Sequence, residues 1–227
     1  MASHVATYNN GGQQSTSAPS IANVVGSAGT FLWVVTLWQS GGNCTGINYG
    51  ATPLSLGTQV VAQTVTIREG FLALPAGTAT VSAALDAAAD NVWVIAKVIT
   101  SSQSLERIGT AVAVSGSGIT TLSATLALPP SEGILLAAAY HRDTIQSELS
   151  AGSGGTQDLA LEETNWGSTG WSAHDITSDN VQMNWGPTSS NGVHMIVAAF
   201  GSVVPPFIPV GQYVCGTIPL QLRYQRR

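Results

Sequence analysis

Two short segments place a histidine next to an aspartate, which is the pairing that a metal site or an acid–base catalyst requires. These segments are His141-Arg142-Asp143 and His174-Asp175. Imidazole and carboxylate groups are common metal ligands and common proton carriers. No third ligand lies at a fixed spacing from either pair, and a histidine and an aspartate often meet in loops by chance. We therefore predict neither a metal site nor a catalytic site from these pairs.

The other catalytic patterns in the chain are incomplete. Glu162 and Glu163 are adjacent at the end of an expected strand, where alternation sends their side chains to opposite faces. A glycosidase pair would then need a remote partner. The Ser/Gly loops at 115–118 and 152–155 lack the Gly-x-Ser-x-Gly spacing of a nucleophile elbow. We predict a protein that is not an enzyme and needs no metal or cofactor.

Tryptophan supplies a second kind of candidate site. Aromatic rings stack on the apolar faces of sugars, and the loops are rich in Ser, Thr and Asn, which hydrogen-bond hydroxyl groups. Trp166 and Trp171 lie in a Gly-rich stretch and form the candidate sugar-binding pair. The other four tryptophans lie in strand patterns and are expected in a core or an interface: Trp33, Trp38, Trp93 and Trp185.

Charge is scarce, and this limits the choice of partners. Charged residues make up 8% of the 227 residues, and the formal net charge is -5. Nucleic-acid binding needs clustered Lys and Arg, so we expect no nucleic-acid partner. The longest apolar stretch, 24–38, is broken by Gly and Thr, and the N-terminus lacks the pattern of a secretory signal. We expect no membrane partner, and we expect neighbouring subunits to cover much of the uncharged surface.

Short β-branched and aromatic runs, separated by Gly, Pro, Asn and Ser, predict strands along most of the chain. The expected strands are 31–38, 60–67, 79–85, 92–100, 109–114, 120–126, 134–140, 159–163, 181–185 and 193–200. A helical turn at 85–89 is an open alternative. The fold class is therefore all-β, an antiparallel, jelly-roll-like β-sandwich. Its expected core contains Phe31, Trp33, Val65, Leu74, Val81, Trp93, Ile95, Leu126, Leu135, Trp185, Ile196 and Val197.

The two ends differ in composition from this sandwich. We predict a flexible polar N-terminal arm at 1–28, the sandwich domain at 29–202, and a Pro-containing C-terminal arm at 203–227 that could add a strand. We expect the apolar residues of the C-terminal arm to be buried against a neighbouring subunit. The predicted interface residues are Pro205, Pro206, Phe207, Ile208, Tyr213, Leu220, Leu222, Arg223, Arg226 and Arg227.

Cys44 and Cys215 are the two cysteines, far apart and outside any metal-ligand spacing. Two buried free thiols are expected. A single disulfide that fastens the C-terminal segment to the domain is the alternative.

Two segments carry a family resemblance. They are Ile47-Asn48-Tyr49-Gly50-Ala51-Thr52-Pro53-Leu54 and Leu72-Ala73-Leu74-Pro75-Ala76-Gly77-Thr78-Ala79-Thr80-Val81. Together with the strands at 92–100 and 193–200, they resemble a β-sandwich module of tailed-bacteriophage structural proteins, over about 31–201. The resemblance implies a virion protein, because such modules occur in head decoration proteins, head fibres and tail components.

Composition and resemblance together predict a structural virion protein, assembled in the host cytoplasm, that decorates or cements a phage capsid. Its expected partners are further copies of itself, in a homo-oligomer such as a trimer, and other virion proteins such as the major capsid protein. The alternative function is a carbohydrate- or receptor-binding module of a phage tail, a fibre or a cell surface.

Overall fold

The computed structural model describes residues 2–12, 15–57, 59–62, 65–126, 133–141, 150–151, 156–163, 168–174, 180–184 and 192–202. Within these ranges the chain is all-β, with no helix, and every strand pair is antiparallel. The predicted fold class, a jelly-roll-like β-sandwich, is confirmed.

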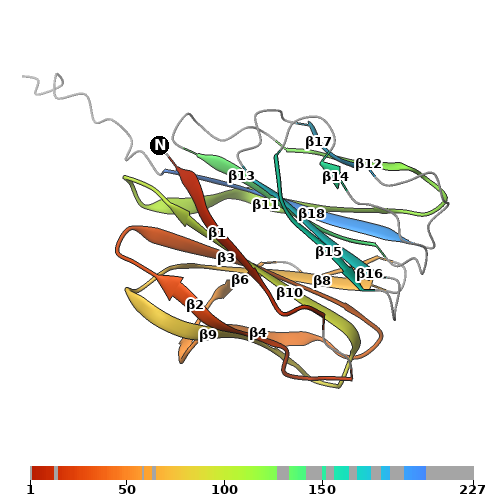
Figure 1. Ribbon diagram of the computed structural model, residues 1–227, viewed down its shortest axis with the longest axis horizontal. Helices are drawn as coiled ribbons and strands as arrows, with labels where there is room; N and C mark the ends of the chain where they lie inside the picture. The colour runs from red at the N-terminus through yellow and green to blue at the C-terminus, as the bar shows by residue number, and fades with distance from the viewer. Residues whose placement is uncertain are drawn as a thin grey trace, which may run out of the picture.

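Four sheets form four layers (Figure 1). The outer N-terminal sheet has the order β2 (Ser20–Gly26), β9 (Gly77–Leu85), β4 (Cys44–Tyr49) and β5 (Thr52–Pro53). The inner N-terminal sheet has the order β1 (Ser3–Asn9), β10 (Asp90–Thr100), β3 (Thr30–Gln39), β8 (Val65–Ala73) and β6 (Ser55–Leu56), with β7 (Val60–Ala62) also on β8.

The C-terminal half repeats this two-sheet arrangement. Its inner sheet has the order β11 (Leu105–Gly116), β18 (Val193–Ser202), β13 (Ile134–His141), β16 (Ser168–His174) and β15 (Thr156–Glu163). Its outer sheet has the order β12 (Thr121–Thr125), β17 (Asn180–Asn184) and β14 (Ser150–Ala151). The molecule is thus two sandwiches stacked face to face, joined by the linker 101–104 between β10 and β11.

Strand alternation explains why the inner sheets are apolar on both faces. Along β3, Phe31, Trp33, Val35 and Leu37 enter the central core between the two inner sheets, while the intervening Leu32 and Val34 enter the core beneath the outer N-terminal sheet. On β13, Ile134, Leu136 and Ala138 face the central core, and Leu135, Ala137 and Ala139 face the C-terminal outer sheet. The segment 134–139 is therefore buried on both faces.

Most core predictions hold. Eleven of the twelve predicted core residues are buried, and the twelfth, Trp185, lies outside the described residues. Trp33, Trp38 and Trp93 are all fully buried. The segment 85–89 holds no helical turn, because β9 continues through Leu85 and bends follow.

Two predicted segments differ in the structure. The run 60–67 was expected as one strand, but β7 pairs back on β8, with Ala62 opposite Val65 and Val60 opposite Ile67. Val61, on β7, is exposed at the edge of this sheet. Two parts of the expected N-terminal arm, Ser3–Asn9 and Ser20–Gly26, are strands, because each finds a sheet edge on β10 or β9 that supplies the hydrogen bonds it cannot make alone.

Candidate functional site at the interface of the two sandwiches

A buried ion pair joins the two inner sheets. Lys97, the one lysine of the chain, lies on β10 in the series Trp93, Ile95, Lys97, Ile99 that faces the central core. Its Nζ lies 3.1 Å from each carboxylate oxygen of Asp158 on β15. The lysine side chain is 0% exposed and the aspartate side chain 7% exposed.

Strand β1 completes the surroundings of Asp158. His4 Nε2 lies 3.1 Å from Asp158 Oδ2, and the Thr7 hydroxyl also donates to that oxygen. Thr7 pairs with Lys97 across the β1–β10 ladder, so both reach the same carboxylate. Burial opposes the charged form of Asp158, but the His4 hydrogen bond, the Lys97 charge and the Thr7 hydroxyl outweigh it and hold the pKa of that carboxyl well below its usual range.

A second ion pair crosses the same interface. Glu69 on β8 is 0% exposed and pairs with Arg107 on β11. Trp33 Nε1 donates to Glu69 Oε2 at 2.5 Å, and the Arg107 guanidinium lies 5.4 Å from the centre of the Phe71 ring. Because the carboxylate, guanidinium and indole satisfy one another, two charges are accommodated in an apolar core.

A glycine makes room for this pair. A Cβ atom on Gly57 would overlap Glu69 Oε1 and lie 2.7 Å from Arg107 Nη1. The Gly57 amide also donates to the Glu69 backbone carbonyl at 2.9 Å. The chain thus passes directly over the Glu69 carboxylate, which only glycine permits without displacing it.

The scarce positive charges of the described residues all serve internal contacts. Lys97 and Arg107 bridge the two sandwiches, and Arg68 Nη1 donates to the Cys44 carbonyl at 3.1 Å. The outer sheets instead present small neutral residues, such as Thr121, Ser123 and Thr125 on β12. Chemically, the arrangement can hold the two sandwiches together as one block, and the described strands of the two outer sheets carry no charged residue.

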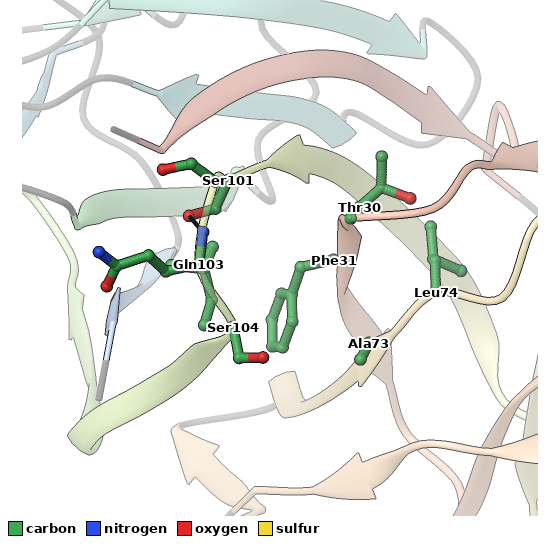
Figure 2. A pocket seen from close by; sticks show the side chains of 10 residues that line it. Thr30, Phe31, Ala73, Leu74, Ser101, Gln103 and Ser104 are labelled. Carbon is green, nitrogen blue, oxygen red and sulfur yellow. Dashed lines mark hydrogen bonds between the residues drawn. The ribbon is translucent and has the colours of Figure 1, made fainter. Parts of the chain in front are cut away.

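One pocket lies at the joint of the two sandwiches, with a volume of about 350 Å³. Its walls come from the start of β3, the end of β8 and the linker, as Figure 2 shows for Phe31, Ala73 and Ser104. Leu105, the first residue of β11, also lines it. The floor is apolar and the linker side carries serine hydroxyls.

Several predicted site residues fall where the structure is not described. Trp166 and all predicted interface residues from Pro205 to Arg227 lie outside the described residues, as do Arg142, Asp143 and Asp175. Trp171, His141 and His174 lie on strands β16 and β13, which pair with each other, but their side chains are not described. The sugar-binding pair and the interface residues therefore stay predictions, and no site is assigned to the two histidine–aspartate segments.

The prediction of two buried free thiols can be compared with the structure at Cys44 alone. Cys44 is buried and free, and burial raises the pKa of its thiol. Its expected companion Cys215 lies outside the described residues. The described ranges contain no group of three His, Cys, Asp or Glu side chains placed to hold a metal ion, and no helix there is long and apolar enough to cross a membrane.

Sequence reasoning missed the buried ion pairs, although a signal for two of their members was present. Lys97 and Glu69 each occupy an apolar series at period two, which places a charge on a buried face and calls for a partner. Asp158 carried no such signal, because β15 has a register shift between Gln157 and Leu159 that sets its orientation.

Comparison with known proteins assigns no family. No family model and no curated protein matches the chain. Among solved structures, the crystal structure of the major capsid protein P2 from bacteriophage PM2 matches with 13% identity and a TM-score of 0.30. The match covers 91% of this chain and 99% of that chain. Because the two backbones differ this much, the similarity assigns no function to this protein.

Proposed function

We propose that this protein is a structural component of a phage virion that decorates or cements the capsid. The observation that carries the proposal is the distribution of charge. Each described basic side chain is engaged inside the molecule, and the outer strands present threonine and serine. A block held together by internal ion pairs, whose described outer strands carry neutral residues, suits close packing against neighbours, where each buried charge would cost desolvation.

The burial of the ionisable groups also supports a structural role rather than a catalytic one. Three continuous apolar cores run through four layers, and the ionisable groups that the structure gathers lie buried between the inner sheets. A group that no substrate can reach cannot act as a general acid or base. Ion pairs in this position instead fix how one sandwich sits on the other.

We propose that the subunits associate as a homo-oligomer, with a trimer as the specific expectation, and attach to the major capsid protein through the C-terminal segment. Apolar residues of that segment gain up to about 1.5–3 kcal/mol each when fully covered. The basic residues at its end, Arg223, Arg226 and Arg227, would meet acidic groups of the neighbour. Attachment should therefore weaken only modestly with salt, because the apolar contribution is larger.

Binding to purified particles that lack the protein tests the proposal. The full chain should co-sediment with the particles to saturation, and a variant without residues 203–227 should fold but stay in the supernatant. Full occupancy by the truncated variant would refute the role of the C-terminal segment. Failure of the full chain to bind, combined with retention on a glycan surface that depends on Trp166 and Trp171, would favour the carbohydrate-binding alternative.

A further inference from the structure

We infer that one internal water molecule is bound in the core of the N-terminal sandwich, between the side chains of Thr36 and Arg68. Thr36 lies on β3 and Arg68 on β8, which are neighbours in the inner sheet. The water accepts a hydrogen bond from Arg68 Nε and donates one to Thr36 Oγ1. The site lies inside one sandwich, so it holds whether or not the protein is a virion component.

Thr36 and Arg68 are direct neighbours across the β3–β8 ladder. The register pairs the two residues, so their side chains project from the same face of the inner sheet. The Cβ atoms of residues paired in this way lie about 4.5–5.5 Å apart. Leu32, Val34 and Trp38 share this face of β3 and belong to the core beneath the outer N-terminal sheet. Both polar side chains therefore enter an apolar core.

Each of the two side chains has a buried polar atom that lacks a partner. Thr36 is 0% exposed, and its Oγ1 has no hydrogen-bond partner among the described residues. Arg68 Nε is likewise buried and without a partner in the described part of the chain. The large majority of buried side-chain polar atoms bond to protein or to ordered water. Two exceptions on paired residues therefore indicate a partner that they share.

The neighbours of Thr36 that the structure describes offer no other partner. Val34 and Trp38 flank Thr36 along β3, and Val94 lies opposite it on β10. All three belong to the same core, and Trp38 Nε1 already donates to the Gly42 carbonyl at 3.0 Å. Polar groups that lie close together without a direct hydrogen bond are commonly bridged by water.

A water molecule fits this pair better than an ion does. Arg68 Nε can only donate, whereas the Thr36 hydroxyl can donate or accept. Water offers an acceptor to the first and a donor to the second, which meets the minimum of two polar partners that a buried water needs. An anion would bring a full charge into an apolar core at a large desolvation cost. A cation would be repelled by the guanidinium.

The bound water also supports a contact between the two sheets of this sandwich. Arg68 Nη1 donates to the Cys44 carbonyl at 3.1 Å, and Cys44 begins β4 in the outer sheet (Figure 1). Because the guanidinium is planar and rigid, contacts at both Nη1 and Nε hold it in one orientation. The water on Nε thus helps to keep Nη1 directed at β4.

A crystal structure of the full chain, at a resolution that shows ordered solvent, tests the site directly. One water should lie within about 2.7–3.2 Å of both Arg68 Nε and Thr36 Oγ1. In a Thr36→Val crystal this water should be lost, because one of its two partners is gone. A direct hydrogen bond between Thr36 and Arg68, or no solvent peak between them, would overturn the inference. An anomalous peak at this position after a bromide soak would also overturn it, because the occupant would then be an anion.

Stability in solution gives a second test through the sign of one effect. Thr36→Val removes a partner of the bound water, so the equilibrium constant for unfolding should rise about two- to tenfold. Without the water, the same change would remove a buried unsatisfied hydroxyl, and the constant would stay the same or fall. Thr30→Val is the control on the same strand, because the buried Thr30 hydroxyl donates to the Ser27 carbonyl at 2.6 Å. A rise for Thr30→Val with no rise for Thr36→Val would contradict the bound water.

Discussion

Lys97 and Asp158 meet across the central interface with Nζ 3.1 Å from both carboxylate oxygens, although 61 residues separate them in the sequence. Lys97 belongs to the N-terminal sandwich and Asp158 to the C-terminal one. The pair is buried, and His4 and Thr7 both contact Oδ2 of the same carboxylate. Together with the Glu69–Arg107 pair, it therefore helps to fix the relative position of the two sandwiches.

Removal of either Lys97 or Asp158 alone should lower the free energy of unfolding strongly. Removal of both charges should lower it much less. Lys97→Met leaves an uncompensated carboxylate, and the free energy of unfolding should fall by about 3–5 kcal/mol. The double variant Lys97→Met with Asp158→Leu should recover most of that loss, because neither charge remains. Denaturant unfolding of the two single variants and the double variant measures the coupling. Additive losses would show that the two residues do not interact.

The lowered pKa of Asp158 predicts how stability depends on pH. The folded-state pKa lies below the unfolded-state value of about 3.9, so the contribution of this carboxylate is fully present above that value and is lost as the pH falls below it. The stability difference between the native chain and Asp158→Asn should be constant near neutral pH and shrink below about pH 4. Denaturation at a series of pH values measures it. A difference that stays constant down to pH 3 would contradict this role.

Two buried tryptophans should respond differently to the same substitution. Trp33 Nε1 donates to Glu69, whereas Trp93 Nε1 has no hydrogen-bond partner among the described residues. Trp33→Phe removes a hydrogen bond to a buried carboxylate, but Trp93→Phe removes an unsatisfied donor. Trp33→Phe should be the more destabilising of the two by about 1–3 kcal/mol. Thermal or denaturant unfolding of the matched pair checks this, and equal losses would count against the Trp33–Glu69 contact.

A glycine pair tests the packing over the second ion pair. Gly57→Ala should lower stability by about 1–3 kcal/mol, because the new methyl group would overlap the Glu69 carboxylate. Gly46→Ala is the control, since its Cβ would meet nothing nearer than Asn48 Nδ2 at 3.9 Å. That control should change stability by no more than about 0.5 kcal/mol. Similar losses in both variants would contradict the overlap with Glu69 as the cause, because the Cβ atom at position 46 has no close neighbour.

Alternation along the strands made the core predictable, since residues such as Trp93 and Ile95 show their buried face in the sequence. The hairpin at 60–67 was not predictable in the same way, because β7 and β8 together read as one alternating run. Strands β1 and β2 were missed because polar segments such as Ser3–Asn9 gain stability from a neighbouring edge, which local composition does not report.

The division into two stacked sandwiches was also hidden. An inner sheet that is apolar on both faces reads as the centre of one domain, and nothing in the run 101–104 marks it as the crossing point between two sandwiches. The ion pairs depend on that stacking, so Asp158 could not be assigned to Lys97 before the sheets were placed.

The copy number of this protein in purified phage particles tests the central claim most directly. Quantitative mass spectrometry of intact particles should find it in a fixed ratio to the major capsid protein, as symmetric decoration of a shell requires. Absence from the particles, or presence in only a few copies at a tail tip, would contradict a decoration role.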